Sequence, residues 1–280
     1  VAGIEIPPRA KFIRTIILEL ERLYNHIGDV GNVCIGASFL MCGSHGFRMR
    51  EHIQQLNETI CGNRYLRGMI TIGGVRFDIH DDLKKHILDL LDRVKTDFKE
   101  LVEIMFTSSS FLDRIETTGR LSLEHAKGLG VVGVPARASG ICRDTRRNHP
   151  YAAYSEIDFD IPVYHDEGDV YARVKVRVDE VYQSMSIIEQ CFNKMPEGSI
   201  KTSLKEFPPY KQALSYVESP RGEDIYWIMT APNNMLYRYK VRSPSFCNWP
   251  SIPYTIPGNI VPDFPLINKS FELCYSCTDL

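Results

Sequence analysis

The segment PPRAKFIRTIILELERLYNHI, residues 7–27, is the part of the sequence that decides the fold. Its apolar side chains recur at steps of three and four residues, at Ile13, Ile16, Leu20, Leu23 and Ile27. This spacing places them on one face of an α-helix. Pro7 and Pro8 suit a first helical turn, because the N–H group that proline lacks has no partner there. We expect this helix to continue loosely to about Leu40 and to break at the Gly-Ser-His-Gly sequence of residues 43–46.

Other segments carry the same helical pattern. Residues 83–105 and residues 168–191 each present one apolar stripe, and residues 47–60 are expected to form a helix after the glycine-rich break. A shorter helix is expected after Ser122, with Glu124 in its first turn and Gly128 or Gly130 at its end. Residues 133–166 are rich in Gly, Pro, Arg and Asp and are expected to be irregular, and residues 70–75 should form a loop or a short extended piece.

The hydrophobic pattern of the sequence changes from helical to strand-like after Pro196. Residues 213–217, 224–230 and 235–241 carry β-branched and aromatic side chains in partial alternation, with a Pro-Asn-Asn turn at 232–234. They predict a small antiparallel sheet. The proline-rich tail from Arg242 is expected to be loop-like. The predicted fold class is mainly α with a small antiparallel β part, as a bundle of long helices in a single domain that spans residues 1–280.

Composition excludes some classes of function. Hydrophobic residues make up 44% and charged residues 24% of the 280 residues, which is typical of a globular protein. The net charge of −2 gives no electrostatic drive towards nucleic acid or anionic lipid, so we expect no nucleic-acid partner. No apolar run approaches the roughly 20 residues of a membrane span. The chain has no initiator Met and no visible signal peptide, which we interpret as an N-terminally incomplete protein.

Two of the eight cysteines are closely spaced, in the sequence Cys274-Tyr275-Ser276-Cys277. Two thiolates at this spacing can bind one metal ion, and sulfur ligands favour zinc, iron–sulfur clusters, copper(I), or nickel and iron. Half of a metal site, a pair without metal function and a redox dithiol all remain open on the spacing alone. A four-thiolate site would need a second pair from elsewhere.

Three other polar positions are candidates. Arg221 lies between two predicted strands, where a turn would fix a permanent cation on rigid backbone, although an ordinary hairpin with an exposed salt bridge explains it too. Arg137 precedes a cluster of charges at residues 143–147 and could line a polar cavity or meet an anionic partner, whereas a solvated loop is the plainer interpretation. His26 lies near the buried edge of the first helix, where a lone histidine is usually a satisfied core residue.

The order of these segments is more specific than any one of them. Together the chain resembles the large subunits of group 4 membrane-bound nickel–iron hydrogenases, of the formate hydrogenlyase or energy-converting type, and the related 49-kDa subunit of respiratory complex I. The matching segments cover essentially the whole chain: residues 7–10, 19–26, 50–51, 73–75, 118–120, 137–141, 158–163, 168–169, 218–223 and 242–246. The terminal cysteine motif of residues 274–278 looks like that of the hydrogenase branch.

The resemblance implies a large-subunit helix bundle and a reaction, H2 ⇌ 2H⁺ + 2e⁻, at a thiolate-bound nickel–iron centre with CO and cyanide ligands. By position, Cys274 would be a terminal nickel ligand and a catalytic residue, and Cys277 a bridging metal ligand. Arg221 would lie near the cyanides and the open site as a catalytic and cofactor-binding residue, and we take Arg137 as a further candidate cofactor-binding residue. The implied partners are an iron–sulfur small subunit, membrane subunits and maturation proteins, with the chain peripheral on the cytoplasmic side of the membrane.

The chain also departs from the family pattern. The first metal-binding cysteine pair is not among these residues, Glu272-Leu273 stands where the family has Asp-Pro, and Leu280 stands where it has His or Arg. Glu272-Leu273 and Leu280 favour an alternative, which Cys274 and Cys277 oppose: a complex I-like subunit that has no nickel–iron centre and forms a quinone or other substrate cavity. A metal-free interaction module is a third interpretation. For the chain alone, we expect the segment from Pro262 onward to lack a helix and to be poorly ordered or held by fortuitous contacts, with no nickel bound.

Overall fold

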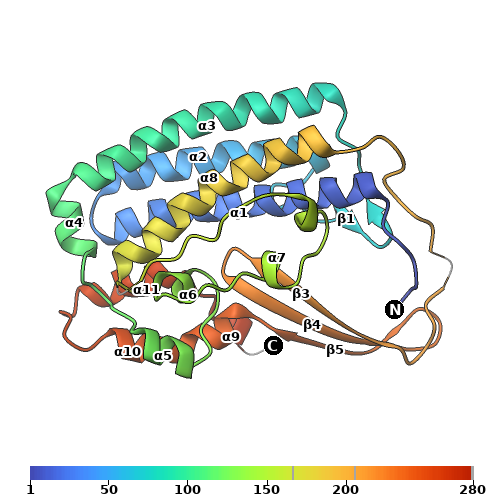
Figure 1. Ribbon diagram of the computed structural model, residues 1–280. Helices are drawn as coiled ribbons and strands as arrows, with labels where there is room; N and C mark the ends of the chain where they lie inside the picture. The colour runs from blue at the N-terminus through green and yellow to red at the C-terminus, as the bar shows by residue number, and fades with distance from the viewer. Residues whose placement is uncertain (166, 205, 279–280) are drawn as a thin grey trace.

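Four long helices form the main layer of the molecule in this computed structural model, which describes residues 1–165, 167–204 and 206–278. They are α1 (Pro8–Gly36), α2 (Leu40–Cys61), α3 (Asp81–Thr107) and α8 (Val170–Lys194). Figure 1 shows them side by side, with a small sheet beneath them and the C-terminal helices at one end. Helix α1 packs mainly against α2 and α8. The predicted class, mainly α with a small antiparallel sheet, is therefore confirmed.

Helix α1 owes its central place to its apolar stripe. Ile13, Ile16, Leu20, Leu23 and Ile27 are all fully buried. They belong to one continuous core that also includes Ile53 of α2, Phe98 of α3 and Val181 of α8. The helix begins directly after Pro7, whose backbone is extended, so the expected N-terminal boundary is confirmed within one residue.

The predicted end of α1 is wrong, and so is the predicted break at residues 43–46. Helix α1 ends at Gly36, and Ser38 turns the chain with a φ of 64°. Gly43 and Gly46 lie inside α2, where they allow close packing against α1. A Cβ atom at Gly46 would lie 2.8 Å from the Cα of Gly31. These glycines allow a close helix–helix contact. From sequence alone, glycines with this role cannot be distinguished from glycines that end a helix.

We expect Gly46→Ala to lower the free energy of unfolding by about 1–3 kcal/mol, because the new methyl group must push two helix backbones apart. Gly128→Ala is the matched control, since nothing lies within 4 Å of its Cβ position. The control should be neutral, or more stable by up to about 1 kcal/mol through helix propensity. Urea unfolding of both variants measures the difference, and equal stabilities would contradict the packing role of Gly46.

The other predicted helices are present. Residues 83–105 lie within α3, and residues 168–191 correspond to α8, where the Asp169 side chain accepts a hydrogen bond from the Ala172 N–H at the first turn. Ser122 caps α5 (Leu123–Gly128), as expected, and α4 (Ser109–Ile115) follows α3. Across the described residues, no helix combines the length and the apolar character that crossing a bilayer requires.

The predicted sheet is confirmed with nearly the expected bounds. Strands β3 (Gln212–Ser219), β4 (Gly222–Thr230) and β5 (Leu236–Arg242) pair antiparallel in the order β3-β4-β5. The turn between β3 and β4 holds Arg221. Gly222 adopts a φ of 131°, and a Cβ atom there would lie only 2.8 Å from the backbone of Gly133. Residues 70–75 form a small hairpin of β1 (Ile70–Thr71) and β2 (Gly74–Val75).

Two regions predicted to lack helices contain short ones. The region 133–166 holds α6 (Val134–Ala138), α7 (Thr145–Asn148) and the 3₁₀ turn η1 (Tyr154–Glu156). The tail after Arg242 holds α9 (Pro244–Asn248), η2 (Trp249–Ser251), α10 (Ile252–Thr255), α11 (Asp263–Phe271) and η3 (Ser276–Thr278). The loop-like prediction is wrong because proline occupies the first turn of α9, η2 and α10, where it is tolerated. Leu266 and Phe271 of α11 are buried in the core.

Candidate functional site

Cys277 lies in η3, which contacts α9, and Cys274 precedes this turn by two residues. Figure 1 shows the C-terminal end of the chain near α9. The Cys274 sulfur lies 3.2 Å from the Ser276 Oγ, at hydrogen-bond distance for a sulfur atom. Interaction with the Cys277 thiol lowers the pKa of Cys274, with Ser276 adding to the effect. The same interaction and partial burial raise the pKa of Cys277. The Cys274 thiol therefore ionises more readily than the Cys277 thiol.

Side chains of α9 and η2 hold this motif in place. The Cys274 N–H donates to the Ser245 Oγ at 3.0 Å, and the Trp249 Nε1–H donates to the Cys274 carbonyl at 3.1 Å. The Ser243 hydroxyl donates to the Cys277 carbonyl at 2.7 Å. The expectation that no helix follows Pro262 is wrong, because α11 spans Asp263–Phe271. The tail beyond α11 is held by these local contacts, which was one of the two expected alternatives. Leu280, one of the departures from the family pattern, lies outside the described residues.

Arg221 reaches from the β3–β4 turn to helix α1. Its guanidinium makes a two-pronged contact with the Asp29 carboxylate, through Nη1 to Oδ2 and through Nη2 to Oδ1 at 3.0 Å. Burial lowers the pKa of Arg221, but Asp29 outweighs this and the pKa is raised. The Arg221 side chain is 22% exposed, so one side of the cation faces solvent-accessible space while the other is neutralised. A fixed cation of this kind suits an anionic ligand.

Glu272 links this cation to the cysteine motif. It caps α11 with a φ of 52°, a left-handed conformation that favours Gly or Asn at such a position. Its carboxylate accepts a hydrogen bond from the Asn32 amide on α1. Burial raises the pKa of Glu272, and the Asp29 charge raises it further while Arg221 opposes both. Two residues before Cys274, the chain therefore brings a carboxylate into the electrostatic field of the Arg221–Asp29 pair.

A cavity of about 170 Å³ lies beside Cys277. It is lined by Val241, Arg242, Phe246, Cys277 and Thr278. The Arg242 guanidinium is held by the Glu223 carboxylate at 2.6 Å, so a second oriented cation borders the cysteine motif. The cavity can therefore admit a small ligand next to one of the two sulfurs.

Arg137 is fully buried in an ion-pair cluster, so a solvated loop is not what the structure shows. Its guanidinium lies 2.6 Å from Glu180 of α8 and 2.9 Å from Glu218 of β3. Around this pair lie further buried charges of the same cluster: Glu19, Arg22, Asp144 and Arg146. Arg137 thus contacts side chains and backbone of the cluster, and its role in binding a cofactor stays a prediction.

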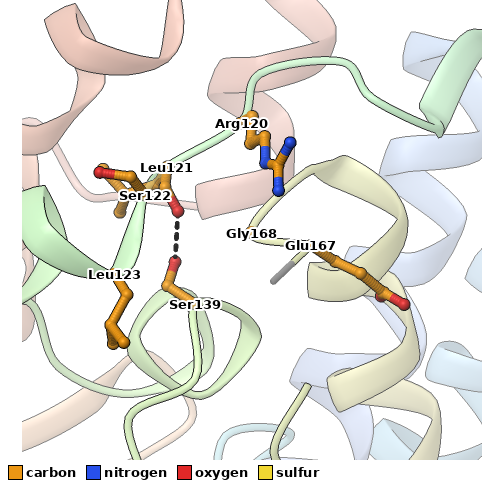
Figure 2. A pocket seen from close by; sticks show the side chains of 7 residues that line it. All are labelled: Arg120, Leu121, Ser122, Leu123, Ser139, Glu167 and Gly168. Carbon is orange, nitrogen blue, oxygen red and sulfur yellow. Dashed lines mark hydrogen bonds between the residues drawn. The ribbon is translucent and has the colours of Figure 1, made fainter. Parts of the chain in front are cut away.

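A second cavity, of about 180 Å³, lies near the start of α5 (Figure 2). It is lined by Arg120, Leu121, Ser122, Leu123, Ser139, Glu167 and Gly168. The Ser139 hydroxyl donates to the Leu121 carbonyl across it at 3.0 Å. This cavity shares no lining residue with the cavity beside Cys277 and contains no cysteine. Its lining is mostly apolar surface, and none of its lining residues belongs to the candidate site.

The donor set fits two ligands of a thiolate-bound metal. The two thiols shift one another's pKa, so they interact, and their C-x-x-C spacing suits a pair that binds one ion. Within the residues that the structure describes, no group of three or more His, Cys, Asp or Glu side chains could hold a metal. A complete thiolate set would therefore take its other ligands from outside these residues.

Sequence reasoning found the cysteines and Arg221 but missed three of their neighbours. Asp29, Glu272 and Arg242 complete the polar surroundings of the motif. Asp29 carries one usable signal, because Glu19, Arg22, His26 and Asp29 follow one another at steps of three and four residues and so share one face of the helix. Glu272 stands out in the sequence only as a departure from the family pattern.

Similarity to known proteins places the chain in a family. A family model described as respiratory-chain NADH dehydrogenase, 49-kDa subunit, matches residues 35–213 and 204–280. The chain belongs to this family.

Relatives in the family include hydrogenase proteins. The chain is 37% identical to formate hydrogenlyase subunit 5 of Escherichia coli over 278 residues, which are 99% of this chain and 48% of that protein. It is 36% identical to hydrogenase-4 component G of the same organism over 277 residues, which are 99% of this chain and 47% of that protein. It is also 32% identical to the carbon monoxide-induced hydrogenase of Rhodospirillum rubrum over 280 residues, which are 100% of this chain and 77% of that protein.

These relatives confirm the resemblance to group 4 hydrogenase large subunits and to the complex I 49-kDa subunit. The chain spans about half the length of formate hydrogenlyase subunit 5 and of hydrogenase-4 component G. The matched family model bears the name of the complex I protein, whereas these three relatives bear hydrogenase names. The local chemistry of the site therefore has to distinguish the two branches.

Proposed function

We propose that this member of the 49-kDa family is the large subunit of a nickel–iron hydrogenase that interconverts H2 with protons and electrons. The observation that carries the proposal is the pair of interacting thiols, Cys274 and Cys277, whose backbone is held by α9. Glu272, two residues before Cys274, interacts electrostatically with the Arg221–Asp29 pair. The sequence similarity to formate hydrogenlyase subunit 5 supports the same assignment. The arrangement combines sulfur ligands, a fixed cation and a small cavity, which is what a site for a diatomic substrate needs.

Cys274 and Cys277 would hold the nickel–iron centre together with ligands from outside these residues. That centre, with CO and cyanide ligands, supplies the redox chemistry when bound. Cys274, the sulfur whose pKa is lowered, is the proposed terminal nickel ligand and the base that takes up a proton at its Sγ atom. Cys277, next to the cavity, would be the second metal ligand that this chain supplies.

Arg221 would face the centre from the hairpin. Its guanidinium is oriented by Asp29 and remains charged, so it can donate hydrogen bonds to anionic ligands in a fixed direction. Arg137 has no comparable opening, because it is fully buried among carboxylates. We propose that Arg137 acts on the cofactor through the packing of these neighbours.

The proposed setting is a membrane-bound complex. One relative is named as a subunit of formate hydrogenlyase, and the matched family model is named for a subunit of the respiratory-chain NADH dehydrogenase. We propose an iron–sulfur small subunit as electron partner, membrane subunits as the anchor, maturation proteins for insertion of the centre, and a peripheral position on the cytoplasmic side. The iron–sulfur cluster would lie in the partner protein. The 280 residues are proposed to form one domain of that large subunit.

A second candidate function comes from the other branch of the family. The matched model is named for the complex I protein, and its match includes residues 204–280, which hold the cysteine motif and Arg221. In that case the chain would have no nickel–iron centre, and the cavity beside Cys277 would belong to a quinone or other substrate site.

Metal analysis of the natively matured, full-length complex tests the proposal. We expect nickel to be present in proportion to this chain and to be lost with the cysteine pair. A catalytically competent complex that contains no nickel would contradict the hydrogenase assignment. If that complex also bound a quinone that protects Cys277 from alkylation, the second candidate function would be supported.

We expect Arg221→Lys to leave the fold intact and to lower H2 turnover by roughly 10–100-fold, as changes beside a metal site do. Lysine keeps a charge but loses the planar fork that grips both oxygens of Asp29. The measurement is turnover per bound nickel. Arg114→Lys is a control, because Arg114 makes a single short contact with Asp263, a residue of α11 outside the candidate site. Equal turnover in the two variants would show that Arg221 has no role in catalysis beyond its place in the β3–β4 turn.

A further inference from the structure

His26 lies at the middle of α1 and is fully buried between two carboxylates. Its Nε2 atom lies 2.8 Å from Glu180 Oε2 on α8, at hydrogen-bond distance. Its Nδ1 atom lies 3.7 Å from Asp29 Oδ2, one turn further along α1. The ring therefore stands between the carboxylate that holds Arg221 and a carboxylate of the buried charge cluster.

Both carboxylates are held from their other sides. Asp29 is gripped by Arg221, and its Oδ2 also lies 3.2 Å from Arg177 Nε. Glu180 lies 2.6 Å from Arg137 and 3.6 Å from Arg22. The result is a continuous line of contacts, Arg137–Glu180–His26–Asp29–Arg221, which connects α6, α8, α1 and the β3–β4 turn.

The contact of Nδ1 with Asp29, at 3.7 Å, is the longest in this line. The Nδ1 atom is buried, and within the described part of the chain it has no hydrogen-bond partner. Leaving a buried polar atom unpaired costs about 1–3 kcal/mol, so such an atom calls for an explanation. The interpretation of His26 as a satisfied core residue is therefore incomplete. A movement of under about 1 Å would bring Asp29 Oδ2 to hydrogen-bond distance from Nδ1.

We propose that His26 is a positioning residue that holds Asp29 for Arg221 and receives Asp29 when Arg221 turns towards an anionic ligand. With Nε2 anchored on Glu180, the ring cannot rotate away, so its Nδ1 side stays directed at Asp29. Asp29 then keeps two partners, Arg177 and His26, when the guanidinium moves, and the His26 ring restrains the position of its Oδ2 atom. The effect on turnover rests on the proposed function, whereas the positioning of Asp29 does not.

Two substitutions separate the halves of the ring. His26→Gln keeps a donor at the Nε2 position for Glu180 and removes the Nδ1 side that faces Asp29. His26→Asn keeps a polar atom near the Nδ1 position and loses the contact with Glu180. If His26 is only structural, its role depends on the Glu180 hydrogen bond, and His26→Gln should change the reactivity of Arg221 less than His26→Asn does. If His26 positions Asp29, His26→Gln should change the reactivity of Arg221 more, and His26→Asn should restore part of the parental behaviour.

The readout is the rate at which phenylglyoxal modifies Arg221 in the purified complex, followed by mass spectrometry of its peptide. Because Arg221 is only 22% exposed and is held by Asp29, the parent should react slowly. We expect a roughly tenfold faster rate in His26→Gln, the size of a typical coupling between neighbouring side chains. His86→Gln, at an exposed histidine of α3, is the matched control and should react like the parent. Turnover per nickel should fall in parallel in His26→Gln alone.

Parental Arg221 reactivity in folded His26→Gln protein would overturn the proposal. If that variant does not fold, Glu180→Gln weakens the anchor of the ring from α8, and parental reactivity of Arg221 in that protein would overturn it equally. The modification rate needs no bound metal. A parent complex without nickel would therefore contradict the hydrogenase assignment while the comparison of Arg221 rates still decides the role of His26.

Discussion

Bound nickel and H2 turnover should both disappear from the matured complex when Cys274 is replaced by serine. A hydroxyl group is a harder and more basic donor than a thiol, and it is a poor ligand for nickel. The local backbone should survive, because Cys274 is anchored through its N–H and carbonyl groups by Ser245 and Trp249. The measurement is nickel per chain together with H2 turnover.

The control is Cys142→Ser, which removes an exposed thiol from a loop. This variant should keep its nickel and its activity. A Cys274→Ser complex that retained both would remove Cys274 from the metal ligands, and the terminal motif would then have to be explained by its packing against α9.

The largest loss of stability is expected from Arg137→Met. This change leaves Glu180 and Glu218 buried without the cation that lies 2.6 Å and 2.9 Å from them. Burial raises the pKa of Glu180, and Arg137 is the strongest of the charges that reverse this and keep it low. Removing one partner of a buried ion pair costs about 3–5 kcal/mol, and this should appear in chemical unfolding.

Arg48→Met provides the comparison, because Arg48 is 50% exposed and pairs with an exposed Asp97 at 2.9 Å. A surface pair of this kind contributes about 0–1 kcal/mol. If the two variants lost equal stability, the buried cluster would be no more important to the fold than a surface salt bridge.

Local periodicity was enough to predict the long helices. The stripe from Ile13 to Ile27 is buried as expected, and the Ser122 cap and the three strands of the sheet lie where their patterns place them. These features depend on neighbours in the sequence. The break expected at residues 43–46 failed because Gly46 packs against Gly31 on another helix, which no local pattern records.

The site was less accessible to sequence reasoning than the fold. The cysteine pair could be found by its spacing, and Arg221 by its turn. The partner of Arg221 could not, since Asp29 is separated from it by 192 residues and is brought near only by the packing of the hairpin on α1. Arg137 looked like a loop residue because its carboxylate partners come from α8 and β3, far along the chain.

Helix α1 carries a second stripe besides its apolar one. Glu19, Arg22, His26 and Asp29 follow one another at steps of three and four residues, and all are buried. Their partners come from distant parts of the chain: Arg146, Arg177, Glu180 and Arg221.

This second stripe has a consequence for the order in which the chain folds. The apolar stripe of α1 can collapse early onto neighbours such as α2, but its charged stripe cannot leave water until segments more than a hundred residues away supply the opposite charges. Closing such long loops is slow, because their entropy is lost before the contacts form. The charged stripe of α1 can therefore be buried only when α7, α8 and the β3–β4 hairpin pack against it. This makes the last step of folding a cooperative assembly around one helix.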